Sequence, residues 1–112
     1  MELRLEDRPV DSWTVLEVEG EVDIYSAPKL RERLVELISG GNHRIIVSLE
    51  GVGFMDSTGL GSLVAGLKRI KEHDGVLALV CTREPVLKVL SITGLDKVFP
   101  LHASVEEATA SR

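Results

Sequence analysis

The chain has 112 residues with 44% apolar content, which is enough for one domain with a hydrophobic core and too short for two. Its formal net charge is -5 and its basic residues are scattered, so a nucleic-acid partner is not expected. No apolar run approaches the roughly 18 residues that a membrane span needs, and the charged N-terminus lacks a signal-peptide pattern. We therefore expect a soluble, cytoplasmic protein with no membrane contact.

The N-terminal part of the chain has the pattern of a β-hairpin followed by a helix. Apolar and charged residues alternate over residues 3–6 and again over residues 13–22, with turn-forming residues between them. Apolar residues then recur with helical spacing over residues 27–38, where Pro28 suits the first helical turn. Ser26 stands directly before this helix and is expected to cap it.

The middle of the chain predicts a parallel strand, helix and strand. Residues 45–49 and 76–81 are short, rich in branched side chains and almost continuously apolar, which is typical of strands covered on both faces. Residues 60–70 between them carry the clearest amphipathic stripe in the chain. Short links between such elements imply a right-handed crossover. Cys81, the only cysteine, is expected to be a buried small hydrophobe.

Smaller elements are predicted toward the C-terminus. Pro85 opens a further helix, and residues 98–101 predict either a short edge strand or an extended segment. A last short helix is expected over residues 105–108, and residues 109–112 should fray. The whole pattern predicts one α/β domain with a mixed sheet of about four or five strands, which opens with a hairpin and carries its helices mainly on one face.

The residues that could take part in catalysis, binding or modification lie in the segment GFMDSTGLGSLV, residues 53–64, where the central strand meets the following helix. Free N–H groups and the partial positive charge of helix N-termini collect ligands at this edge of α/β sheets. The Asp-Ser-Thr triplet at residues 56–58 is equally explained as a helix cap. Gly59 and Gly61 each cost the helix about 0.5 to 1 kcal/mol relative to alanine, which indicates close approach by a partner or by packing.

Catalytic interpretations of this segment fail on their own requirements. A nucleophile elbow needs glycine two residues before the serine, but Met55 stands there before Ser57, and no histidine is placed to activate the hydroxyl. The aspartic-protease triplet fails because an extra residue separates Asp56 from the glycine. No Cys/His cluster and no carboxylate spacing suits a metal. We expect no enzymatic activity, no metal and no cofactor, and we expect Phe54 and Met55 to lie in the core.

Phosphorylation remains, with two candidate acceptors. The first is Asp56, because an aspartate after a central strand superficially resembles the acceptor of a response-regulator receiver domain. That class would also need an acidic pair after its first strand and a lysine at the end of a late strand, whereas Lys97 is not clearly at a strand end and the chain opens with a hairpin. The second candidate is Ser57.

Three segments together carry a resemblance to a known family: Gly20-Glu21-Val22-Asp23, Ser26-Ala27-Pro28-Lys29-Leu30 and Phe54-Met55-Asp56-Ser57-Thr58-Gly59-Leu60. They are similar to the anti-sigma factor antagonists, small bacterial proteins built from the STAS domain. The resemblance covers nearly the whole chain. It implies partner switching: the unphosphorylated protein binds a serine-kinase anti-sigma factor and so releases a sigma factor. Phosphorylation by that kinase ends the binding, and a metal-dependent serine phosphatase reverses it.

The resemblance implies that Ser57 is the phosphoacceptor. It also implies a docking surface around this serine, which comprises Asp23, Asp56, Ser57, Thr58, Gly59 and Leu60. Thr58 is a neighbouring hydroxyl that has to be distinguished from Ser57. A non-switching scaffold or ligand-binding module of the same family is a further alternative. The oligomeric state is open between a monomer and a weak dimer, because the edge of the opening hairpin could pair with a second copy.

Overall fold

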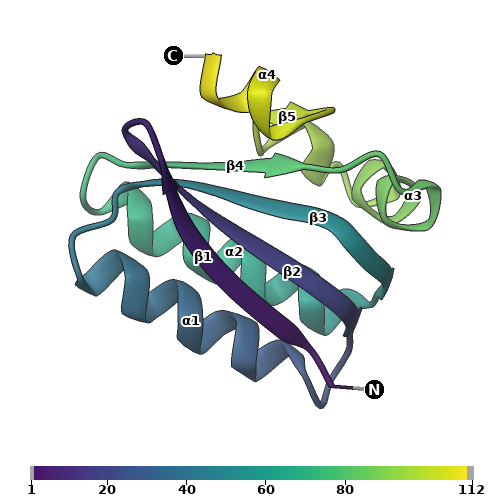
Figure 1. Ribbon diagram of the computed structural model, residues 1–112. Coiled ribbons are helices and arrows are strands. Elements are labelled where there is room, and N and C mark those ends of the chain that lie inside the picture. Colours follow the sequence, from purple (N-terminus) through teal and green to yellow (C-terminus); the bar gives the residue numbers. More distant parts are fainter. Residues whose placement is uncertain (1, 111–112) are drawn as a thin grey trace.

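The computed structural model describes residues 2–110, which form a five-stranded sheet with helices around it (Figure 1). The elements in chain order are β1 (Arg4–Val10), β2 (Trp13–Val22), α1 (Ala27–Ser39), β3 (Arg44–Met55), α2 (Ser57–Lys71), β4 (Val76–Val80), α3 (Glu84–Ile92), the 3-10 helix η1 (Leu95–Lys97), β5 (Leu101–His102) and α4 (Val105–Ala110). The strand order is β1-β2-β3-β4-β5, and only the β1–β2 pair is antiparallel. The predicted mixed sheet with an opening hairpin is confirmed.

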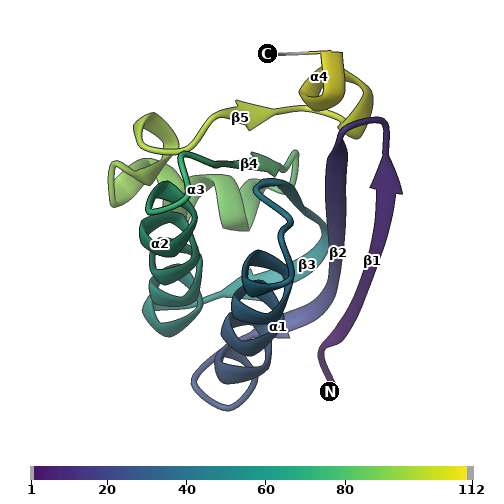
Figure 2. The same cartoon turned by 90° about the vertical axis from the view of Figure 1, so that its left-hand side faces the viewer.

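The two faces of the sheet are covered unequally. Helices α1 and α2 lie side by side along one face, and the short α4 lies on the other (Figure 2). The larger apolar core lies under α1 and α2 and includes Leu16, Ile45, Leu34 and Leu63. A smaller cluster beside α4 comprises Trp13, Val15, Ile46, Ala78, Val80 and Ala108. The prediction that the helices lie mainly on one face is therefore confirmed, and part of the opposite face stays open.

Several local predictions can be compared with the structure. Cys81 is 4% exposed at the end of β4, as expected, and burial raises the pKa of its thiol. The segment near residue 100 contributes the short edge strand β5. Of the residues expected to fray, Thr109 and Ala110 form the end of α4, and residues 111–112 are outside the described residues. Within residues 2–110, no helix has the length and apolar character needed to cross a membrane.

Gly59 and Gly61 both lie near the start of α2, but their surroundings differ. A Cβ on Gly59 would lie 2.7 Å from Val22 Cγ1 and 2.8 Å from Met55 Cγ, and 3.1 Å from the Val22 carbonyl oxygen. Only glycine lets the helix start approach the end of β2 so closely. A Cβ on Gly61 would meet nothing within 4 Å. Packing explains Gly59, whereas Gly61 faces open space.

This difference gives a matched pair of substitutions with opposite expected signs. Gly59→Ala should lower the free energy of unfolding by about 1 to 3 kcal/mol, because the methyl group overpacks the contact with Val22. Gly61→Ala should raise it by about 0.5 to 1 kcal/mol, because it meets no contact and lowers the entropy of the unfolded chain. Urea unfolding followed by circular dichroism measures both. Equal effects of the two substitutions would contradict the close-packing explanation.

Candidate functional site

The start of α2 is organised by the carboxylate of Asp56. Asp56 is the N-cap residue, and its Oδ1 accepts hydrogen bonds from the backbone N–H of Thr58 at 2.9 Å and of Gly59 at 3.1 Å. These donors have no partner within the helix, and a carboxylate also suits the positive end of the helix dipole. Ser57 is the first helical residue, and its side chain is exposed. Of the triplet Asp56-Ser57-Thr58, it is therefore Asp56 that caps the helix. The Ser57 hydroxyl is not used as a cap.

The loop between β2 and α1 is closed by a second aspartate. Oδ1 of Asp23 accepts hydrogen bonds from the backbone N–H groups of Tyr25 and Ser26, each at 3.0 Å. The bond from Ser26 is the largest influence that holds the pKa of the Asp23 carboxyl below its usual value of 3.8, and burial opposes it. The carboxylate therefore shapes the turn.

Ser26 contributes to the same loop and does not cap α1. Its hydroxyl donates to the Glu21 carbonyl oxygen at 2.7 Å and accepts from the Asp23 N–H at 2.9 Å. It occupies the N-cap position but forms no side-chain cap hydrogen bond, so the predicted cap was wrong. The hydroxyl is already engaged across the loop, since it faces the end of β2 and not the first turn of α1.

Hydrogen bonds tie this loop to the start of α2. The Asp56 N–H donates to the Val22 carbonyl oxygen at 3.1 Å, next to the residue that opens the loop. The hydroxyl of Ser62 on α2 donates to the carbonyl oxygen of Ala27, the first residue of α1, at 3.0 Å. Both hydrogen bonds lie at the end of the sheet where β2 and β3 finish (Figure 1). Asp23 and Ser57, 34 positions apart in the sequence, thus belong to one surface.

The remaining predicted site residues divide by exposure. Thr58 is exposed beside Ser57, whereas Gly59 and Leu60 are buried, Leu60 at 5%. Phe54 is 47% exposed at the end of β3, so its predicted core position was wrong, while Met55 is buried as expected. Neighbours on a strand point to opposite faces, which separates this apolar pair.

Two residues of this surface were missed by sequence reasoning. Ile24 and Tyr25 lie in the loop closed by Asp23, and they are 62% and 90% exposed. The loop that carries them follows Val22, whose carbonyl oxygen accepts the hydrogen bond from Asp56, so it lies next to the start of α2. The sequence contains a signal for this exposure. Ile24 and Tyr25 stand between Asp23 and Ser26 in a predicted turn, where no strand or helix face is available to bury them.

The site is suited to binding and to modification. Within residues 2–110, no group of three His, Cys, Asp or Glu side chains could hold a metal ion. What the surface offers is an accessible serine hydroxyl at a helix start, beside a fixed carboxylate and next to a loop with two exposed apolar side chains. An arrangement of this kind is typical of a surface by which a small α/β domain contacts another protein.

Comparison with known proteins agrees with this class. The STAS domain family matches residues 4–108. The anti-sigma-B factor antagonist of Staphylococcus epidermidis is 35% identical over 106 residues, which cover 95% of this chain and 98% of the relative. A crystal structure of an anti-sigma factor antagonist from Mycobacterium paratuberculosis superposes with a TM-score of 0.91 at 25% identity, covering 98% of this chain and 93% of the other. The Bacillus cell fate determinant SpoIIAA in its phosphorylated form matches with a TM-score of 0.73 at 25% identity, covering 96% of each chain.

The chain therefore belongs to the STAS domain family. This family is regulatory, and the antagonists of anti-sigma factors are among its members. The alternative of a receiver domain is wrong. Doubly wound receivers have the all-parallel strand order 2-1-3-4-5, whereas this sheet runs in sequence order with an antiparallel edge strand. Asp56, the acceptor in that alternative, is used here as the helix cap.

The lowered pKa of Asp23 predicts an acid transition of the loop. A depressed folded-state pKa means that the carboxylate stabilises the loop fully above about pH 4 and that this contribution is lost as the pH falls through the folded-state pKa. A 13C NMR titration of the Asp23 carboxyl should give a midpoint below 3.8. Asp23→Asn retains an acceptor oxygen, so it should keep the loop and abolish the acid response of the Tyr25 and Ser26 amides. A midpoint at or above 3.8 would contradict the role given to these hydrogen bonds.

Proposed function

We propose that the protein is a phosphorylation-controlled anti-sigma factor antagonist. In its unphosphorylated form it binds a serine-kinase anti-sigma factor and thereby releases a sigma factor. The kinase then phosphorylates Ser57, binding ends, and a serine phosphatase restores the first state. The observation that carries this proposal is the exposed position of Ser57 beside the fixed carboxylate of Asp56. A cytoplasmic location follows from the proposed partners, because sigma factors act on RNA polymerase there.

The docking surface divides into residues that make contact and residues that hold the contact surface in place. Ile24 and Tyr25 offer exposed apolar area, and large aromatic side chains such as that of Tyr25 are the usual anchors of protein interfaces. Ser57 and Thr58 lie on the same surface and offer hydroxyl groups. The open space beside Gly61 would let a partner backbone approach α2.

The other predicted site residues act through the backbone. Asp23 holds the loop that presents Tyr25, and Asp56 fixes the first turn of α2. Gly59 and Leu60 are buried and would support binding by holding the helix start against β2. Substitutions at these positions would weaken binding by disturbing the shape of the surface.

Negative charge added at Ser57 would switch partner binding off by electrostatic repulsion. A phosphoserine adds about 1.5 to 2 negative charges, and here it would lie next to a carboxylate that already occupies the helix N-terminus. The phosphate could take over the Thr58 and Gly59 N–H groups only by displacing Asp56, so the two anions would face the partner together. A penalty of about 3 kcal/mol at such a contact weakens binding on the order of a hundredfold. No refolding of the domain is required.

Two substitutions of Ser57 test the proposal. Ser57→Ala should bind the cognate anti-sigma kinase as tightly as the unphosphorylated protein, because the surface keeps its shape and charge. Ser57→Asp should bind at least about tenfold more weakly, because it adds a like charge beside Asp56. Isothermal titration calorimetry against each anti-sigma serine kinase encoded in the same genome measures the difference.

A charge control separates a local effect from one of net charge. Ser12 is exposed in the turn between β1 and β2, at the other end of the sheet, so Ser12→Asp adds the same charge away from the surface. It should leave the affinity unchanged. Equal affinities of the Ser57→Ala and Ser57→Asp variants, or an equal loss with Ser12→Asp, would contradict the mechanism.

A further inference from the structure

Helices α1 and α2 lie side by side (Figure 2), and a groove of about 220 Å³ separates them on their outer face. Its lining consists of Arg31 and Val35 on α1 and Ala65, Lys68, Arg69 and Glu72 on α2. The four charged residues are exposed, whereas Val35 and Ala65 are half-buried. The groove therefore has an apolar floor and charged walls, and it lies away from the core.

Close packing of the two helices fixes the shape of the groove. A Cβ on Gly66 of α2 would lie 2.9 Å from Leu34 Cδ1 of α1, so glycine permits this approach. The Ser62 hydroxyl adds a hydrogen bond of 3.0 Å to the carbonyl oxygen of Ala27. Because these contacts hold the helices in a fixed relation, a partner would meet walls that are already in place, which lowers the entropic cost of binding.

The cations near the start of α1 are not explained by helix stability. The first two turns carry three cations, at Lys29, Arg31 and Arg33, against one carboxylate, and the first turn has no acidic residue. A helix N-terminus is the positive end of the helix dipole, so cations there do not stabilise the helix. Two of the three have internal partners: Lys29 Nζ donates to the Leu3 carbonyl oxygen at 2.7 Å, and Arg33 pairs with Asp7 at 3.0 Å. Among the described residues, Arg31 has no ion pair and no side-chain hydrogen bond.

The cations on the α2 side of the groove have no internal partner either. Lys68 and Arg69 lie in the last turn of the helix, where the negative end of the dipole favours them. Within residues 2–110, however, neither side chain has an ion pair or a hydrogen bond, even though Glu72 lines the same groove. Helix stability thus explains the type of these residues but leaves their charged groups available to a partner.

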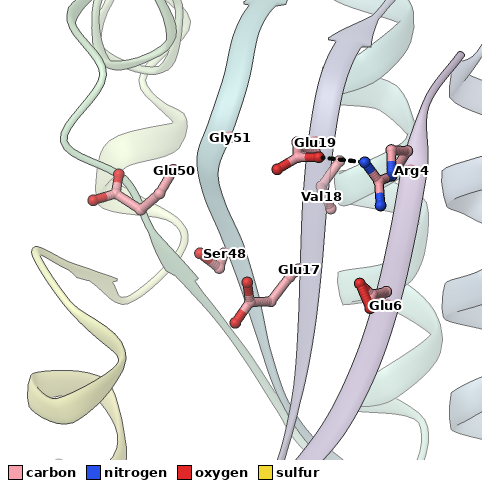
Figure 3. A pocket seen from close by; sticks show the side chains of 8 residues that line it. All are labelled: Arg4, Glu6, Glu17, Val18, Glu19, Ser48, Glu50 and Gly51. Carbon is pink, nitrogen blue, oxygen red and sulfur yellow. Dashed lines mark ion pairs between the residues drawn. The ribbon is translucent and has the colours of Figure 1, made fainter.

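Charges on the open face of the sheet are paired, in contrast to those of the groove. Arg4 lies 3.5 Å from Glu19 (Figure 3), and Arg8 lies 2.9 Å from Glu17. The arginines of that face are therefore used within the fold, whereas the groove holds three cations against one carboxylate. On a chain with a net charge of -5, a positive surface of this kind indicates an anionic partner.

The surroundings of the cations indicate which anionic partner fits. A nucleic acid is disfavoured, because three cations release few counterions and the chain as a whole is negative. A small inorganic anion would find no buried polar side chain in the lining to hold it. An acidic protein segment suits the groove better. Its carboxylates can form charge-assisted, bidentate hydrogen bonds with guanidinium groups, and an apolar side chain between them can cover Val35 and Ala65.

The groove continues toward the surface around Ser57. One row along α2 is formed by residues at three- or four-residue spacing: Thr58, Gly61, Ala65 and Lys68. A Cβ on Gly61 would meet nothing within 4 Å, which leaves this row open between the serine and the groove. At the rise of an α-helix, Lys68 lies about 16 Å from Ser57 along α2, a distance that one protein interface can span.

We propose that the protein partner that binds around Ser57 also places an acidic segment in this groove, where its carboxylates pair with Arg31, Lys68 and Arg69. This inference rests on the function proposed above. The cations lie farther from Ser57 than the Debye length of about 8 Å at physiological ionic strength, so phosphorylation weakens their contact little. The groove thus accelerates the encounter and orients the partner, while the serine controls how long the complex lasts.

Stopped-flow kinetics with the anti-sigma serine kinase that binds the Ser57→Ala variant test this contact. At physiological ionic strength, the double variant Arg31→Glu, Lys68→Glu should lower the association rate constant about tenfold, because it reverses the charge that attracts the acidic segment. Most of this loss should disappear at an ionic strength of about 1 M, where the Debye length falls to about 3 Å. The matched control, Lys88→Glu, Lys97→Glu, makes the same charge change at exposed positions outside the groove. It should change the rate constant less than about twofold.

The outcomes separate this inference from the proposed function. Equal effects of the two double variants, or a loss that is the same at both ionic strengths, would overturn the groove contact alone if the kinase still distinguishes Ser57→Ala from Ser57→Asp. Failure of every anti-sigma serine kinase encoded in the genome to bind Ser57→Ala would refute both. Cosedimentation with phosphatidylglycerol vesicles that only the groove variant loses, without an effect on kinase binding, would assign the groove to a membrane surface and also refute the proposal.

Discussion

Asp56 holds together the surface on which the proposed function of this protein depends. Its carboxylate accepts the hydrogen bonds of the Thr58 and Gly59 N–H groups, and its own N–H donates to the carbonyl oxygen of Val22. The first interaction sets where α2 begins, and the second attaches this point to the end of β2. Without them the serine that follows would have neither a fixed position nor a fixed charged neighbour. Gly59 adds the close contact that presses the helix start onto the strand.

The same constraint makes a rigid switch possible. Because the helix N-terminus is already occupied by a carboxylate, a second anion on Ser57 gains little from the N–H groups and increases the local negative charge. The conformation can then stay as it is while the affinity for a partner changes. The loop closed by Asp23 follows a similar rule, since its internal hydrogen bonds let Ile24 and Tyr25 remain exposed in a defined turn. Preorganised apolar area of this kind lowers the entropic cost of binding.

The order and type of the elements could be predicted from the sequence because each depends on local periodicity and on turn residues. Alternation in residues 13–22 and helical spacing in residues 60–70 report directly on faces that are buried. Details set by contacts across the fold could not be predicted in this way. Ser26 and Asp56 are equally good caps by type, but the hydroxyl of Ser26 is used by the Glu21 carbonyl oxygen. In β3, Leu49 and Glu50 together stand opposite Val18 of β2. This bulge depends on the register between the two strands, which the sequence pattern of β3 alone does not reveal.

Localisation of phosphate on the protein purified from its own cells tests the central claim most directly. Intact-mass and peptide mass spectrometry under acidic conditions distinguishes an ester on a hydroxyl from an acid-labile acyl phosphate on a carboxylate. We expect an acid-stable phosphate on Ser57, present in some growth states and absent in others. Phosphate on Thr58 or on Asp56, or an unmodified protein in every growth state, would contradict the assignment of Ser57 as the switch.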